Sequence, residues 1–402
     1  MFVMRRATTE DVPTLLKLAK MVHFINLPAD KDIIADKATW SAECFAKAGT
    51  GDRHLVGESS GRKPDTEWRG TQDRGAGPVY SGGKSGGEDG LAAAVSRSDL
   101  FMFVLEDTEA GGILGTSQII AHMGGPGRPN VSLRLSKKDM FSQTLQMGAS
   151  HVTARLFLDE TGPTEIGGLI LSPTHRGHKA RLGRFLSLVR FHFVALHREL
   201  FADRIIAELM GPVTPDGQNT LWEYLGRRFI NLTYAEADSF CQYSKEFITA
   251  LLPREEIYLT LLAPEARSVI GTVGPETLPA RRMLEKLGFA YKDLVDPFDG
   301  GPTLEARTDD VSLIRDTKRV PLSAAAAKDP RQSAIVSTLG EDGEFRAVQT
   351  RVEVGTDGIR LSVEDRAALR AEVGGMIGYT PLTESAGDAR VSGSKRGAAA
   401  AS

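Results

Sequence analysis

The sequence predicts an α+β fold in which a mixed, mostly antiparallel central sheet is flanked by helices and followed by a small β-rich C-terminal region. Hairpin-like strand patterns in the first half of the chain are the first sign. The second is a long amphipathic helix pattern between expected strands at 164–171 and 204–209. The third lies beyond residue 309, where short strand-like runs alternate with turn residues.

The composition is that of a globular protein in a reducing compartment. The chain has 402 residues, 41% hydrophobic and 25% charged, with a formal net charge of −3, so nucleic acid is not the expected partner. Its only two cysteines, Cys44 and Cys241, exclude a disulfide scaffold and a cysteine-based zinc module. Arg184 and Arg190 interrupt the most apolar helical segment, which excludes a membrane span, and Arg5 interrupts the N-terminus, which excludes a secretory signal. We therefore expect a cytoplasmic protein.

The chain is expected to begin with a strand at 2–5 and a helix from Val12, where apolar residues recur at helical spacing. Thr8 and Asp11 have the spacing of a capping box, with Asp in place of the usual Glu or Gln. In the segment 50–98 that follows, the glycine-rich part holds 11 of the 42 glycines and few large apolar side chains. Such a composition buries too little apolar surface to offset the entropy of ordering, so we predict a disordered insert.

Strands and helices are then expected to alternate as far as residue 308. The patterns predict a hairpin of strands 101–106 and 113–120, and a second strand pair, 151–157 with 164–171, around a turn. The remaining elements are a helix at 178–200, a strand at 204–209, helices at 221–229, 236–251 and 279–287, and a closing strand at 289–294. Residues 1–308 therefore form the main predicted domain.

A change of pattern predicts a separate small region at 309–383. Its strand-like runs lie at 311–320, 333–339, 345–354 and 358–362, and a helix is expected at 363–371. From 384 to 402 the chain consists mainly of Ala, Ser, Gly, Lys and Arg, which predicts a disordered tail.

One segment carries a physical mechanism for binding a pyrophosphate. An expected strand at 165–171 is followed by a turn at 172–178 and the start of a helix. Backbone N–H groups at a helix N-terminus have no intrahelical acceptor, and Arg176 beside Gly177 adds positive charge. Turns of this kind also serve packing alone, and from these residues the two interpretations have equal weight.

A second segment, PARRMLEKLGF at 279–289, resembles the ending of the acyl-CoA N-acyltransferase (GNAT-like) fold. In that fold the helix packs beside the pantetheine arm, and the glycine lets the chain turn back into the sheet. The resemblance narrows to the arginine N-succinyltransferase family, and the string FDGGPTLE at 298–305 is its most specific signal. The other matching stretches are 103–107, 165–173, 206–211, 221–229, 269–271 and 275–289.

This resemblance implies a reaction in which succinyl-CoA, or another acyl-CoA, is the co-substrate. The succinyl group passes to the α-amine of L-arginine by direct attack of the amine on the thioester, in a pathway that degrades arginine. It implies no permanently bound cofactor and no metal. The implied partners are small molecules, not nucleic acid or membrane, and the implied assembly is a homo- or hetero-oligomer.

The resemblance also implies cofactor-binding residues. The family's succinyl-CoA contact falls on Leu169, in the strand before the turn, and its phosphate-turn arginine falls on Arg176. Gly177 and Gly183 lie in the glycine-containing part of that turn, where this chain has two extra residues between the arginine and the helix.

Three positions depart from the family pattern. Gly274 replaces the proton-donor histidine, Glu255 replaces a second histidine, and Met210 replaces an arginine. Glycine cannot transfer a proton, which keeps open a non-catalytic paralogue subunit that binds CoA or arginine. The lost arginine at Met210 keeps open an acyltransferase for a different amine.

Several residues are candidates to supply the missing chemistry. Glu165 is a candidate base, with a salt-bridged strand-end carboxylate as an equal alternative. Tyr258 is a candidate acid for the thiolate, with a half-buried core tyrosine as its alternative. Glu208 and Glu255 are candidates to bind the cationic substrate, although Glu208 could instead pair with an arginine. Cys241 is expected to pack, since direct transfer needs no nucleophilic thiol.

Overall fold

The computed structural model describes residues 1–21, 27–50, 97–214, 216–241 and 244–383. The predicted insert at 50–98, apart from its ends, and the predicted tail at 384–402 lie outside the described residues. Within them the strands form one continuous sheet of 15 strands, and β14 (Gly358–Arg360) pairs only with β13. The order of the others is β11-β15-β12-β13-β1-β2-β3-β6-β7-β10-β9-β4-β5-β8. The α+β class with a mostly antiparallel sheet is therefore confirmed.

The N-terminal elements build two cores on opposite faces of the sheet. β1 (Phe2–Arg6) is followed by α1 (Val12–Met21) and α2 (Lys31–Thr50). The carboxylate of Asp11 accepts the N–H of Thr8 at 2.8 Å, which confirms the predicted capping interaction before α1. The helix α2 was not predicted, and it contributes Ile34 to the core under α1 and Phe45 to the core under α3.

Alternation along β2 (Leu100–Asp107) assigns its side chains to these two cores. Phe101, Phe103 and Leu105 face the core that contains α3 (Leu182–Leu196), while Leu100, Met102 and Val104 face the core that contains α1. The two-residue period of a strand produces this division, and because both faces are covered, every one of these positions is apolar. β2 pairs with β3 (Ile113–Ile120) in the predicted hairpin.

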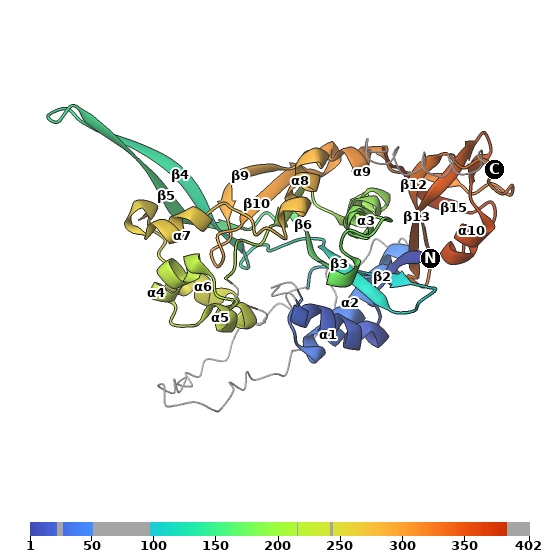
Figure 1. Ribbon diagram of the computed structural model, residues 1–402, viewed down its shortest axis with the longest axis horizontal. Coiled ribbons are helices and arrows are strands. Elements are labelled where there is room, and N and C mark those ends of the chain that lie inside the picture. The colour runs from blue at the N-terminus through green and yellow to red at the C-terminus, as the bar shows by residue number, and fades with distance from the viewer. Residues whose placement is uncertain (22–26, 51–96, 215, 242–243, 384–402) are drawn as a thin grey trace, which may run out of the picture.

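The second predicted strand pair is wrong. β5 (Met147–Asp159) pairs with β4 (Asn130–Ser142) along its full length, and β6 (Thr164–Leu171) pairs instead with β3 and β7. The sequence of β4 is polar and charged and shows no clear apolar alternation, because much of this strand is exposed on both faces. Figure 1 shows this hairpin extending at one end of the molecule, with β12, β13 and β15 at the other.

The helical segments are shorter than predicted. α3 begins at Leu182 rather than 178 and is followed by a separate 3₁₀ turn, Arg198–Leu200. The helix predicted at 236–251 is two helices, and the one predicted at 221–229 is a π-helical turn followed by one short helical turn. Their bounds are α5 (Tyr234–Phe240), α6 (Glu246–Leu251), the π turn Trp222–Gly226 and α4 (Arg227–Phe229).

The remaining elements return the chain to the middle of the sheet. They are β7 (Arg204–Glu208), β8 (Ile257–Tyr258), α7 (Pro264–Val269), α8 (Leu278–Leu287), β9 (Ala290–Val295) and β10 (Pro302–Arg307). Gly288 has φ of 106°, so the left-handed conformation after α8 needs a residue without Cβ, as the sequence predicts. Phe289 then packs against Phe191 of α3.

The C-terminal strands continue the same sheet. The predicted strand at 311–320 is wrong in its first part, which forms α9 (Ser312–Asp316) before β11 (Lys318–Pro321). Four later elements match the prediction: β12 (Gln332–Leu339), β13 (Phe345–Gly355), β14 and α10 (Val363–Leu369). The last strand, β15 (Met376–Pro381), was not predicted. Because β13 pairs with β1, the region is joined to the main sheet.

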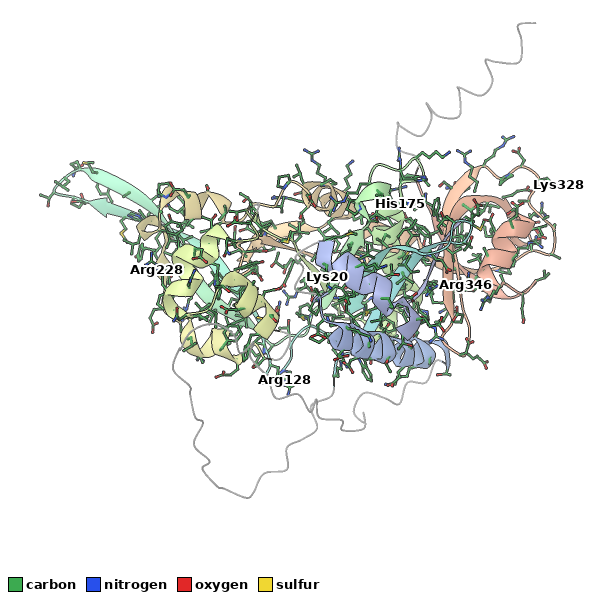
Figure 2. All side chains as sticks on the ribbon, turned by 60° about the horizontal axis from the view of Figure 1, so that its bottom comes forward. Lys20, Arg128, His175, Arg228, Lys328 and Arg346 are labelled. Carbon is green, nitrogen blue, oxygen red and sulfur yellow. The ribbon has the colours of Figure 1, made fainter. Side chains whose placement is uncertain are left out.

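Contacts with α3 hold these strands in place. His192 is fully buried, and its two ring nitrogens each lie 2.6 Å from a hydroxyl, Ser337 Oγ of β12 and Thr380 Oγ1 of β15. Figure 2 labels Arg346 and Lys328 in this region and Arg228 on the helices at the opposite end. No helix among the described residues is long and apolar enough to cross a membrane.

Phe45→Ala should destabilise the protein by about 3–5 kcal/mol in urea unfolding. The ring of Phe45 is fully buried, and it contacts Phe101, Phe103, Phe193 and Phe345 from three elements. Its removal leaves a cavity that these elements cannot close together. The matched control is Phe141→Ala at the hairpin tip, where the side chain is 58% exposed and the change should stay within about 0.5 kcal/mol. Equal effects of the two substitutions would contradict this account of the core.

Candidate active site

The site begins where β6 and β7 diverge. These strands form the one parallel pairing between strands in the described part of the sheet, and they pair only at Thr164 with Ile205 and at Glu165 with Ile206. Beyond these residues β6 continues along β3, and β7 continues along β10. Along their facing edges, β6 and β7 therefore form no backbone hydrogen bonds with each other, and these backbone groups are open to a ligand.

A β-bulge marks the point of divergence. Gly168 and Leu169 together oppose the single residue Ser117 of β3, because the register shifts between Gly167 and Ile170. Gly168 has φ of 56°, and a Cβ there would lie 2.8 Å from Cγ of Gln118. Only glycine fits this conformation without strain, so this residue determines where the strand bends.

A cavity of about 1290 Å³ occupies the divergence. Its walls are the last part of β6, the residues at the end of β7, the turn before α3, the first half of α3, and α8. Side chains from α5, α6 and the loop after β9 close it on the other side. A volume of this size accommodates a large ligand or two smaller ones together.

One part of the cavity is basic. It lies around the N-terminus of α3 and the facing side of α8, and its basic side chains are Arg176, Lys179, Arg181, Arg184, Arg282 and Lys286. Arg176 pairs with Glu276 at 3.1 Å, which ties the turn before α3 to the segment before α8. The exposed N–H groups of the first turn of α3 add to the positive potential. This part suits phosphate groups.

The other part is acidic and is built around the loop 296–301. Asp296 accepts the N–H of Phe298 at 2.7 Å, and Asp299 accepts those of Gly301 at 2.7 Å and Gly211 at 3.0 Å. Glu208, at the end of β7, accepts the side-chain amide of Asn130 at 2.8 Å. These three carboxylates all line the cavity.

Burial and mutual repulsion perturb this carboxylate group. Burial, followed by the charges of Asp299 and Glu208, raises the pKa of Asp296 well above its usual range. Burial also raises the pKa of Asp299 to about 6, against two backbone hydrogen bonds that lower it. Such a cluster of buried, like-charged groups favours binding of a cation, which relieves the repulsion.

Two cations also line the cavity near this part. Burial lowers the pKa of Lys245, but the negative charges of Glu208 and Glu165 outweigh it, so the net direction is upward. Arg190, on α3, is 3% exposed and touches the backbone of β6. The charge of Lys245 is therefore balanced by carboxylates. Within the described residues, the hydrogen bonds of Arg190 go only to neutral groups.

The structure brings together most of the predicted site residues. Four predicted CoA-binding residues and one predicted substrate-binding residue line the cavity: Leu169, Arg176, Gly177, Gly183 and Glu208. Glu165 is 1% exposed and lies one residue before the lining part of β6, where its charge acts on Lys245 and Lys37. Glu165 is therefore buried next to the lining of the cavity, with its charge acting on two lysines, and its role as a base or as a salt-bridged carboxylate stays a prediction.

Two predicted residues lie away from the cavity. Tyr258 is on the short edge strand β8, and its ring contacts His151 and Lys138 of the hairpin. Glu255 is exposed in the loop before that strand. The N–H of Gly274 donates to the carbonyl of Met210 at 3.2 Å, and a Cβ at Gly274 would meet its nearest neighbour at 3.4 Å, an ordinary van der Waals contact.

Several lining residues were not assigned to the site from the sequence, among them Arg190, Tyr234, Lys245, Asp296 and Asp299. Asp299 lies within the string 298–305, which served only as a family signal, although its acidic and glycine residues together predict a functional loop. Arg190 served only to exclude a membrane span. A charged residue on the apolar face of a predicted helix is a signal that could have identified it.

Comparisons with known proteins identify the family of the chain. A family model described as arginine N-succinyltransferase beta subunit matches residues 88–313. The arginine N-succinyltransferase of Yersinia enterocolitica is 38% identical over 279 residues, covering 69% of this chain and 80% of the relative. That of Escherichia coli is 35% identical over 278 residues, with the same coverage. The solved structure titled as subunit AI of arginine/ornithine succinyltransferase from Pseudomonas aeruginosa superposes with a TM-score of 0.72 at 25% identity, covering 96% of this chain and 99% of that one.

Asp238→Asn should stabilise the protein by about 1 kcal/mol at pH 8. Burial and then the charge of Asp296 raise the pKa of Asp238 to about 7 from 3.8, so the folded state binds this proton more tightly than the unfolded state. The free energy of unfolding of the native sequence therefore falls as pH rises from about 4 to about 7. The Asn variant should lack this slope, so its advantage appears above pH 7 and vanishes near pH 4 in thermal unfolding.

Glu236→Gln on the same helix is the matched control. Its carboxylate accepts the N–H and hydroxyl of Thr233, both at 2.8 Å, in a capping box, and the backbone hydrogen bond lowers its pKa. An exposed carboxylate of this kind stabilises above its unfolded pKa, so its loss should cost up to about 0.5 kcal/mol at pH 8. If Asp238→Asn also destabilises at pH 8, the repulsive description of the acidic part is wrong.

Proposed function

Because the chain belongs to the arginine N-succinyltransferase family, we propose that it transfers a succinyl group from succinyl-CoA to the α-amine of L-arginine. The observation that carries the proposal is the single cavity in which a basic part, two diverging strands and an acidic part follow one another. An acyl-CoA is anionic at its phosphates and arginine is cationic at its guanidinium. The two parts of the cavity therefore match the two substrates in charge.

The donor is assigned to the basic part and to β6. The pyrophosphate of CoA lies at the N-terminus of α3, where Arg176 and the first N–H groups of the helix meet it. The pantetheine arm lies along the open edge of β6, and the bulge at Gly168 and Leu169 offers backbone N–H groups to the thioester carbonyl. These groups stabilise the negative charge that develops on the carbonyl oxygen when the amine attacks.

The acceptor is assigned to the acidic part. Arginine carries its positive guanidinium at the end of a flexible side chain, and a buried carboxylate binds that group with two parallel hydrogen bonds. Asp296 and Glu208 supply the charge there. A neutral side chain of the same length would leave these carboxylates desolvated and unpaired, so the pocket discriminates in favour of a cation.

The transfer is a direct displacement. The α-ammonium first loses a proton, the free amine forms a bond to the thioester carbon, and the carbon–sulfur bond breaks to give N2-succinylarginine and the CoA thiolate, which takes up a proton. Asp299, whose pKa burial raises to about 6, is the proposed acceptor of the ammonium proton. Tyr234, which lines the cavity, is the proposed hydrogen-bond donor to the departing sulfur. Burial raises its pKa, so it keeps its own proton and the thiolate takes up a proton from solvent.

A coupled assay of free CoA tests the function. The purified chain should release CoA from succinyl-CoA in the presence of L-arginine, and much more slowly with citrulline, which has the same shape without the charge. Asp299→Asn should lower kcat/KM for arginine by about 100-fold, since it removes the proposed base. A chain that is inactive on every acyl-CoA and amine tested, but becomes active as Gly274→His, would contradict the proposal and favour a non-catalytic subunit.

A pair of tyrosine variants tests the proposed hydrogen bond from Tyr234 to the departing sulfur. Tyr234→Phe should lower kcat by about 10- to 100-fold with little change in KM, because its hydroxyl acts only on the departing thiolate. Tyr258→Phe, on the edge strand outside the cavity, should leave kcat within about twofold. The opposite ranking of the two variants would restore the role predicted from the sequence for Tyr258. Circular dichroism of both variants establishes that they are folded.

A further inference from the structure

Arg190 is a buried guanidinium at the floor of the cavity. It lies on the third turn of α3, it is 3% exposed, and it is one of the residues that line the cavity. Its Nη1 donates to the carbonyl of Gly167 at 3.3 Å, directly before the bulge of β6. Its Nε and Nη2 donate to the carbonyl and hydroxyl of Ser187 at 3.1 and 2.7 Å. The guanidinium is thus held in a fixed orientation beside the point where β6 and β7 diverge.

The charge of this group is not balanced within the described residues. Its hydrogen-bond acceptors are all neutral, and burial alone acts on its pKa, which falls to about 9. Three of its five N–H groups are used by these acceptors, which leaves two for a ligand. A buried cation without an anion is costly, so proteins rarely retain one unless a ligand completes the pair.

The position of Arg190 along α3 selects which anion can reach it. It lies eight residues from Leu182, at the start of the helix, a distance of about 12 Å along the axis, so phosphates bound at the helix N-terminus are out of its reach. Its contact with Gly167 puts it instead beside the acyl group, because the thioester is assigned to the adjacent bulge. An acetyl group would bring no charge there, whereas a succinyl group carries a carboxylate about 5 Å beyond the thioester carbon.

We propose that Arg190 binds the distal carboxylate of the acyl group and so makes the enzyme selective for a dicarboxylic acyl donor. This inference rests on the proposed function, since it assumes that the cavity binds an acyl-CoA. Lys245, the other cation of the inner cavity, is a weaker candidate because Glu208 and Glu165 already act on its charge. The α-carboxylate of arginine is the competing anion, and the experiment below separates the two.

Calorimetric binding to the full chain tests the proposal without turnover. Arg190→Met should weaken succinyl-CoA binding by about 10- to 100-fold, the loss expected for a charged hydrogen-bonded pair. Binding of butyryl-CoA, which has four acyl carbons but no carboxylate, should change by less than about threefold, as should binding of L-arginine. Lys245→Met is the matched control and should leave the ratio of the succinyl-CoA and butyryl-CoA dissociation constants unchanged.

The outcomes separate this proposal from the proposed function. An equal loss for succinyl-CoA and butyryl-CoA makes Arg190 a structural support of β6 and overturns the inference, as does a loss confined to L-arginine. If donor selectivity depends on Arg190 but the native chain releases no CoA, the inference stands and the proposed function fails. If thermal unfolding shows that Arg190→Met does not fold, Arg190→Lys is used. It keeps the charge but not the fork of donors, and should weaken succinyl-CoA binding selectively by about 3- to 10-fold.

Discussion

The divergence of β6 from β7 is the constraint on which the site depends. A parallel pair that stayed in register would satisfy its own backbone and leave no room for a ligand. Here the pairing stops after two residue pairs, while β6 stays paired with β3 on both sides of the bulge at Gly168 and β7 stays paired with β10. The gap exposes strand backbone to the cavity, and the helices α3 and α8 form its walls. The early end of one strand pairing therefore shapes the whole site.

Electrostatic asymmetry gives this gap its chemical character. Basic side chains around the start of α3 face one part of the cavity, and carboxylates from β7 and the loop 296–301 face the other. That loop serves two purposes, because its aspartates accept backbone N–H groups that hold it in place and also present negative charge to the cavity. The repulsion stored among them is the cost of a site prepared for a cation. In these aspartates, the repulsion that lowers the stability of the fold is the same repulsion that favours the binding of a cation.

Sequence patterns predicted the elements that have a local signal and missed those that depend on tertiary contacts. The strands 101–106 and 113–120 and the ending of α8 were predictable, since alternation and a glycine after a helix are local signals. The hairpin of β4 and β5 was not, because strands exposed on both faces show no clear apolar alternation. Arg190 was noticed only as a charge in an apolar segment. Its role depends on the carbonyl of Gly167, which lies 23 residues away in the sequence.

The sequence alone determined the class of fold and the family, and it pointed to the segment 165–184, much of which lines the cavity. These inferences depend on residues close together in the chain. Tertiary structure decided which carboxylates form the acidic part of the cavity, since Glu208 lies at the end of β7 while Asp296 and Asp299 belong to the distant loop 296–301. It also placed Tyr258 and Glu255 away from the cavity and Tyr234 within it. The physical reason is that charge and desolvation act through space over a few ångströms, and no one-dimensional spacing records which distant segments come that close.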